Sequence, residues 1–143
     1  MNKELLCLGH KISVHQPLGN FDLVEGTTPP NVPGPPPHYH TGYNELFLVL
    51  EGKMEFMKDG KLTTVETGES IDLPPNTLHT FKNAGDTPCR WLNIHSPKGF
   101  LSFFEEFGIN AQEGNAFEKS VDSAVINKVI QKATSYDMHI VMP

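Results

Sequence analysis

The sequence predicts an all-β fold, a single sandwich or barrel followed by a short helical extension. Composition is the first reason, because the 143 residues include twelve Gly and twelve Pro and only 38% are hydrophobic. That balance is typical of a turn-rich, strand-dominated protein rather than a helical bundle. The second reason is that short apolar or alternating segments recur between clusters of Gly, Pro and Asn. The length suits one domain with one core.

Eight segments have the pattern of β-strands. The strongest local signal is Asp59-Gly60, a dipeptide that favours a tight hairpin between two of them. Turn residues, among them Pro74-Pro75-Asn76, separate the others. The predicted strands are residues 11–15, 21–25, 45–51, 54–58, 61–66, 70–73, 77–82 and 89–95. No internal repeat is visible, so we expect one barrel rather than two.

A proline-rich segment, residues 27–37, precedes the most informative motif and contains six prolines. Such a run could be a polyproline ligand for a partner domain. It could also be a stiff connection that cannot pair as a central strand. We favour the connection, because the run leads directly into a histidine motif.

Helical character begins only after Pro97. Residues 100–107 form a short apolar segment with Gly108 as a plausible C-cap. Residues 117–134 carry Val121, Val125 and Val129 at intervals of four, the stripe of an amphipathic helix packed on the barrel or on a partner subunit. We therefore predict a single domain over residues 1–143, with a barrel core over about 10–97 and a helical extension over about 98–143.

Charge and hydropathy exclude several functions. The formal charge is −6 and no basic run is present, which argues against nucleic-acid binding. No segment approaches the roughly 18 consecutive apolar residues of a membrane span, and the first residues do not resemble a signal peptide. A cytoplasmic location is the expectation. Cys7 and Cys89 are then predicted to be ordinary reduced thiols, with metal binding a distant second reading.

Three histidines and one glutamate form the candidate site. His38 and His40 are two residues apart, so in a strand both rings point to the same face. Glu45 follows a short turn through Gly42 and begins the next strand, from which its carboxylate can return to the same point. His79 comes from a strand distant in sequence, after Pro74 and Asn76. The combined spacing predicts a metal site.

The donor set restricts the metal and indicates chemistry. Three imidazoles and one carboxylate suit one divalent transition ion, Mn, Fe, Co, Ni, Cu or Zn, rather than Ca or Mg. Four protein ligands leave two positions open on a six-coordinate ion, which is typical of a catalytic site. Glu45 is the predicted base, since a carboxylate at that place lies within reach of a donor on the ion.

The strand faces predict the surroundings of the site. Phe47 shares a face with Glu45, Phe81 shares one with His79, and Phe56 faces in from the neighbouring strand; with Tyr43 at the mouth they form the predicted substrate pocket. For Tyr43 an exposed turn is an equal alternative. Val49 and Met54 are predicted to be barrel core.

The remaining polar residues are assigned to the exterior. Asn93 and His95 could orient a ligand, but an outward or interface position is preferred. His10, His15 and His139 have no site context and are predicted to be surface residues.

Both motifs resemble the two signature motifs of the cupin superfamily. The matching residues of the first are Gly34, His38, His40, Glu45 and Gly52, and those of the second are Gly68, Pro74, Asn76, His79 and Asn83. The first motif has three residues rather than five before His38. Asn76 stands where Gly is common, and Asn tolerates the positive φ of that turn. The resemblance implies a six-to-eight-stranded jelly-roll barrel with the metal inside.

The rest of the chain is similar to small single-domain cupins described as quercetin dioxygenase-like. The supporting segments are residues 21–26, the proline-rich entry to His38, residues 96–106 and residues 136–143. The resemblance implies a dioxygenase that acts on an enol or phenol bound at the ion. Two alternatives stay open: a metal-containing binding or sensing module without turnover, and a metal-dependent isomerase or lyase. A homodimer is the expected assembly, with a small-molecule substrate as the partner.

Overall fold

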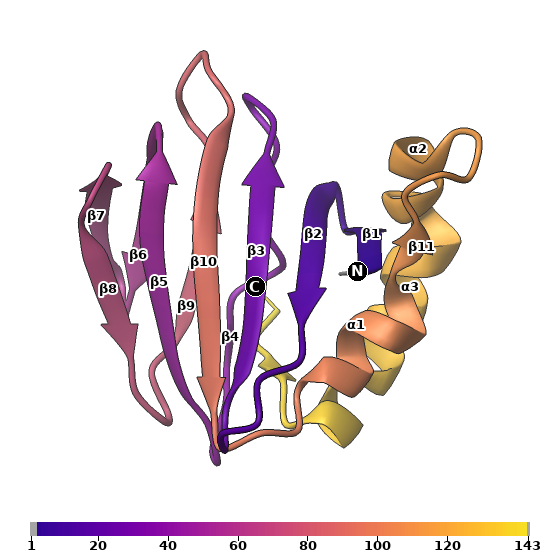
Figure 1. Cartoon of the computed structure of the whole chain (residues 1–143). Coiled ribbons are helices and arrows are strands. Elements are labelled where there is room, and N and C mark those ends of the chain that lie inside the picture. The colour runs from indigo at the N-terminus through magenta and orange to yellow at the C-terminus, as the bar shows by residue number, and fades with distance from the viewer. Residues whose placement is uncertain (1–2, 143) are drawn as a thin grey trace.

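The computed structural model describes residues 3–142 and consists of two antiparallel β-sheets with helices beside one edge (Figure 1). The strands are β1 (Lys3–Cys7), β2 (His10–His15), β3 (Asp22–Thr28), β4 (His38–Tyr39), β5 (Asn44–Glu51), β6 (Lys53–Lys58), β7 (Lys61–Glu66), β8 (Ser70–Leu73), β9 (His79–Lys82), β10 (Cys89–Ser96), β11 (Ile109–Asn110) and β12 (His139–Ile140). The helices are α1 (Leu101–Phe107), α2 (Ala116–Ser120), α3 (Ser123–Lys132) and the 3₁₀ turn η1 (Ala133–Tyr136).

The two sheets form a jelly roll, as the resemblance to the cupin superfamily implies. One sheet has the order β11-β1-β2-β3-β10-β5-β8 and the other has β12-β4-β9-β6-β7. The pairings among the described strands are antiparallel, and each sheet joins strands that are distant in sequence, such as β3 with β10 and β4 with β9. The predicted hairpin between β6 and β7 is present, with Asp59 and Gly60 at φ 49° and 84°. The all-β prediction with a helical extension is confirmed.

Alternation along two central strands directs side chains into the barrel. In β5 the buried positions are Glu45, Phe47 and Val49, and in the adjacent β10 every second residue is buried. Trp91 of β10 lies so close to Gly26 of β3 that a Cβ at position 26 would be 2.2 Å from the indole. The sheets therefore close over an aromatic core, in which Val49 and Met54 are buried as predicted.

Two polar residues predicted to face outward are in the interior. Asn93 and His95 are each only 2% exposed, because they continue the inward series of β10 that begins with Cys89 and Trp91. His10 is also buried, at 5% exposure, because β2 pairs with a β1 strand that was not predicted. These three surface assignments are wrong.

The N-terminal hairpin and the helical extension differ from expectation in detail. β1 and β2 are joined through Leu8 and Gly9, which have φ of 50° and 88°; Leu at a positive φ gives no turn signal in the sequence. The predicted helix over 117–134 is instead α2, α3 and η1. It breaks at Asp122, whose side chain accepts a hydrogen bond from Ala124 N and begins α3. The break changes the helical phase, so Val129 is buried while Val121 is exposed.

The helices lie beside β1 and β11, at the edge of the larger sheet (Figure 1). None of the helices in residues 3–142 is long and apolar enough to cross a membrane. Cys7 and Cys89 are buried free thiols, as predicted.

Candidate metal centre

The four predicted ligands all lie inside the barrel, although no group of ligand atoms within 4.8 Å of one another among the described residues contains both His38 and Glu45. His38 lies in β4 and His40 directly follows that strand, Glu45 is the second residue of β5, and His79 begins β9. All four are buried. His38 and His79 are register partners in the β4–β9 pair, and their rings are 4.4 Å apart.

The proline-rich segment reaches the site along the edge of β9. Gly34 N donates to the carbonyl oxygen of Phe81, and a Cβ at position 34 would be only 2.3 Å from that oxygen. Only a glycine allows this approach, which places residues 35–37 so that β4 can begin at His38. The segment is therefore a connection built into the site, consistent with the interpretation we favour.

The imidazoles are held in the tautomer that a metal requires. His38 Nδ1 donates to the carbonyl oxygen of Pro36 at 2.9 Å, and His79 Nδ1 donates to that of Thr77 at 2.9 Å. His40 Nδ1 donates to the carbonyl oxygen of Asp137 at 2.6 Å. A proton on each Nδ1 leaves each Nε2 with a free lone pair, and such carbonyl contacts are the usual second partners of metal-binding histidines.

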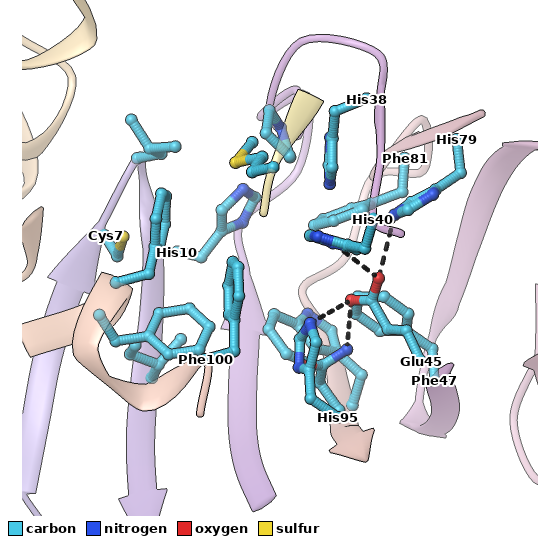
Figure 2. Close-up of a pocket in the computed structure, with 18 residues that line it drawn as sticks. Cys7, His10, His38, His40, Glu45, Phe47, His79, Phe81, His95 and Phe100 are labelled. Carbon is cyan, nitrogen blue, oxygen red and sulfur yellow. Dashed lines mark hydrogen bonds and ion pairs between the residues drawn. The ribbon is translucent and has the colours of Figure 1, made fainter. Parts of the chain in front are cut away.

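The carboxylate of Glu45 contacts two different groups of side chains (Figure 2). Oε1 lies 3.0 Å from His79 Nε2 and 3.5 Å from His40 Nε2. Oε2 accepts a hydrogen bond from Asn93 Nδ2 at 2.8 Å and lies 3.3 Å from His95 Nε2. Ligands at about 2.1 Å from one ion are about 3.0–3.4 Å apart in octahedral or tetrahedral geometry. The 3.0 Å distance to His79 lies in this range, and the 3.5 Å distance to His40 lies just above it.

Electrostatics keep the carboxylate ionised and some of the rings neutral. Burial opposes ionisation of Glu45, but His95, His40 and His79 together hold its pKa well below the ordinary value. Burial, aided by the nearby His79, lowers the pKa of His38 to about 3. Burial lowers the pKa of His95 to about 4. The pKa of His79 is raised, because contact with Glu45 outweighs the effect of burial.

Several buried polar atoms in this cluster have no hydrogen-bond partner among the described residues. They include Glu45 Oε1, His79 Nε2 and both ring nitrogens of His95. His79 Nε2 and Glu45 Oε1 are close but lack hydrogen-bond geometry. Buried groups of this kind are costly unless something satisfies them. Potential ligand atoms fall into two overlapping triads, His38–His40–His79 and His40–Glu45–His95, each within 4.8 Å. These residues fit a borderline divalent ion.

A mainly apolar pocket of about 70 Å³ adjoins the cluster. Phe47 and Phe81, two of the predicted pocket residues, line it. Phe56 does not line it; it is fully buried and packs behind both of them, with ring centroids 5.1 and 5.7 Å away. Tyr43 is half-buried and does not line it either, but its ring lies edge-on to His40 and His95.

The pocket also contains residues that the sequence reasoning missed. His95 lies stacked on Phe100 at 4.4 Å, and Asn93 lies beside it. His10 reaches the pocket from β2, where its Nδ1 is 2.9 Å from Thr28 Oγ1 (Figure 2). The signal for Asn93 and His95 was present, since both share the face of Trp91 at period two. For His10 no signal was available without the pairing of β1 with β2.

A jelly roll with a buried cluster of histidines and one glutamate defines the class of protein. The family model described as "Cupin domain" matches residues 24–95, half of the chain. The chain therefore belongs to the cupin family.

This chain is similar to parts of larger proteins. Quercetin 2,3-dioxygenase of Bacillus subtilis is 26% identical over 106 residues, which cover 74% of this chain and 31% of that protein. An uncharacterized protein, MJ1618, of Methanocaldococcus jannaschii is 32% identical over 60 residues, covering 42% of this chain and 48% of the relative. The chain thus spans half or less of the length of these relatives.

Solved structures support the fold. KdgF from a Halomonas species superposes with a TM-score of 0.58 at 18% identity, covering 63% of this chain and 80% of KdgF. A sugar phosphate isomerase of the cupin superfamily from Silicibacter pomeroyi superposes with a TM-score of 0.58 at 21% identity, covering 64% of this chain and 61% of that chain. At such identities the likeness concerns the fold alone.

Proposed function

We propose that this cupin is a metal-dependent oxidoreductase of small molecules, a dioxygenase that acts on an enol or phenol. His38, His40, Glu45 and His79 would hold one divalent transition ion. The observation that carries the proposal is the orientation of the three imidazoles, whose Nδ1 atoms donate to carbonyl oxygens. The Nε2 atoms of His40 and His79 lie 3.5 and 3.0 Å from Glu45 Oε1, and His38 forms a potential ligand triad with these two histidines. The similarity to a quercetin 2,3-dioxygenase supports the choice of reaction.

The lining of the pocket supports an uncharged substrate. Among the described residues that line it, none is Lys or Arg, and aromatic rings form much of the wall. A phosphorylated sugar would bring a dianion to a pocket in which the proposed ion is the one positive charge and no Lys or Arg among the described lining residues pairs the remaining phosphate oxygens. A neutral enol or phenol suits the apolar wall and the few polar groups. This favours the oxidoreductase over a sugar phosphate isomerase.

The size of the pocket narrows the substrate further. A volume of about 70 Å³ is about half that of an engineered cavity of roughly 150 Å³ that admits benzene. It is also far below the roughly 300–1,000 Å³ of sites for drug-sized ligands. The proposed substrate is therefore a compact enol or 1,3-diketone, and a three-ring flavonol requires the pocket to widen.

Each residue of the site would have a distinct role in the proposed reaction. When bound, the ion supplies Lewis acidity that lowers the pKa of a ligating enol and a site for dioxygen chemistry. Glu45, the ionised carboxylate of the site, would accept the enol proton. Asn93 holds Oε2 of the same carboxylate. Phe47 and Phe81 exclude water and orient the apolar part of the substrate.

Oxygen consumption tests the proposal. Protein loaded in turn with Fe(II), Mn(II), Co(II) and Ni(II) is offered acetylacetone, a compact 1,3-diketone, and quercetin. We expect oxygen uptake with acetylacetone to exceed oxygen uptake with quercetin. Oxygen uptake should also require Glu45, so the Glu45→Gln variant should show none. A loaded protein that binds these compounds without any uptake is instead a binding or sensing module, and the dioxygenase proposal is then wrong.

A further inference from the structure

We propose that the C-terminal segment 137–141 is part of the metal centre, with Asp137 as a positioning residue that holds His40 toward the ion. The inference rests on the proposed metal-binding function and concerns what sets the affinity of that site. It starts from a difference among the three imidazoles. His38 and His79 are each oriented by a carbonyl two residues away in the chain, whereas the carbonyl that orients His40 belongs to Asp137, 97 residues away.

Asp137 contacts both the His40 ring and the turn that follows His40 in the chain. Its carbonyl oxygen accepts the Nδ1 hydrogen of His40 at 2.6 Å. Its carboxylate accepts hydrogen bonds from Thr41 N at 3.0 Å, from Thr41 Oγ1 at 2.7 Å and from Gly42 N at 2.7 Å. Thr41 and Gly42 form the turn that joins His40 to the strand of Glu45. One residue therefore orients a ring and caps the turn between two ligands.

The local conformation allows this double contact. Asp137 has φ 55°, in the left-handed region where Asp is one of the few tolerated residues. It ends the 3₁₀ turn η1, which brings the chain past the site after α3. The next residue, Met138, is 2% exposed and lines the pocket.

After Asp137 the chain forms β12, which pairs with β4 on the side opposite β9. Strand β12 pairs His139 with Tyr39 and Ile140 with His38, and the rings of His139 and Tyr39 stack at 5.0 Å. His139 Nε2 is also 2.9 Å from Asp137 Oδ1. On its other side β4 has one register pair with β9. The two-residue strand that contains the predicted ligand His38 thus has two of its three register pairs with the C-terminal segment.

The consequence is that metal affinity depends on residues far from the ligands in sequence. Residues that orient histidine ligands typically change metal affinity by about 10–100-fold when they are replaced. Loosening Asp137 affects His40 and, through the turn, the path to Glu45, while the carbonyl contacts of His38 and His79 remain. The ion would then be held more weakly and in a less regular geometry.

The experiment replaces only the side chain of Asp137. Asp137→Gly keeps the carbonyl and the positive φ but removes the carboxylate, and Asp137→Asn retains one acceptor oxygen. Asp122→Gly is the matched control, since Asp122 also caps a backbone N–H, that of Ala124, away from the site. Co(II) affinity is measured by competition with a chromophoric chelator, together with the visible absorption spectrum of the Co(II) protein.

We expect Asp137→Gly to weaken Co(II) binding by about tenfold and to change the Co(II) spectrum. Asp137→Asn should recover part of the affinity, and Asp122→Gly should leave both affinity and spectrum unchanged. His139→Ala, which leaves Asp137 in place, should give a smaller loss and provides a test if Asp137→Gly does not fold. Co(II) affinity and spectrum unchanged in folded Asp137→Gly, or in His139→Ala if Asp137→Gly does not fold, would overturn the inference.

The two proposals can fail separately. If wild type binds Co(II) and Asp137→Gly binds it equally well, the positioning role is wrong while the oxidoreductase proposal is untouched. If affinity falls in Asp137→Gly but wild type consumes no oxygen with any substrate, the positioning role stands and the oxidoreductase proposal falls.

Discussion

The two carboxylate oxygens of Glu45 face different parts of the barrel and contact different side chains. On the Oε1 side lie His40 and His79, which the sequence motifs place there, and within residues 3–142 neither Oε1 nor His79 Nε2 has a hydrogen-bond partner. On the Oε2 side lie Asn93 and His95 of β10, and Asn93 donates directly to the carboxylate. Both sides contain buried ring nitrogens without a hydrogen-bond partner among the described residues, those of His95 included, but only the Oε2 side has a hydrogen bond that restrains the carboxylate. We therefore infer that Oε1 binds the ion and that Oε2 orients the carboxylate.

Removing the shared carboxylate should have the largest effect, because it abolishes both sides at once. We expect Glu45→Ala to weaken metal binding by more than the roughly 100-fold upper range of an orienting partner. Isothermal titration with Co(II) or Zn(II) measures the loss. Ser70→Ala, at an exposed position of β8, is the control and should bind like wild type. If the metal affinity of Glu45→Ala is within a few-fold of wild type, Glu45 Oε1 is not a metal ligand.

The pH dependence of the metal-free protein tests the Oε2 side. His95 has its pKa lowered to about 4 by burial, so its contribution to stability is present above about pH 6.5 and is lost as the pH falls toward 4. At pH 5 the loss from His95 alone is about 2 kcal/mol. Chemical unfolding at pH 7 and pH 5 measures it.

His95→Gln provides the comparison for that measurement, since it cannot take up a proton. We expect its stability to fall less than that of wild type between pH 7 and pH 5. Equal losses in the two proteins would mean that His95 is not held neutral by burial, and the proposed difference between the two sides would then lose one of its supports.

Replacing Asn93 should have a smaller effect on metal affinity than replacing Glu45. Asn93→Leu keeps the approximate volume but removes the 2.8 Å hydrogen bond to Oε2, so the carboxylate keeps its charge and loses one restraint. We expect metal affinity to fall about tenfold, less than in Glu45→Ala. Calorimetric titration beside wild type is the measurement. A loss as large as that of Glu45→Ala would make Asn93 more than an orienting residue.

The same division explains what could be predicted from the sequence. The Oε1 side comes from compact motifs, in which period two and a short turn are enough to bring His38, His40 and Glu45 together. Asn93 and His95 lie on the inward face of β10 by the same period. The outward position was preferred for both, although Asn and His on an inward face need only a buried polar partner such as Glu45.

Other features depend on contacts that no local pattern encodes. β1 pairs with β2 through a turn at Leu8, a residue that rarely adopts a positive φ. The hydrophobic stripe over 117–134 predicts one helix, but Asp122 caps a new one and shifts the phase. The contact between His40 and Asp137 spans 97 residues and requires the complete fold. Long-range pairing and the geometry of single caps were therefore the parts that sequence could not supply.

Metal content of protein purified without a His tag or a chelating column tests the central claim most directly. Elemental analysis of wild type should find about one divalent transition ion per chain, and His79→Ala and Glu45→Ala prepared in parallel should contain much less. Folded wild type that contains only traces of metal, and takes up none when Mn, Fe, Co, Ni, Cu or Zn is added, would contradict the assignment of this cluster as a metal centre.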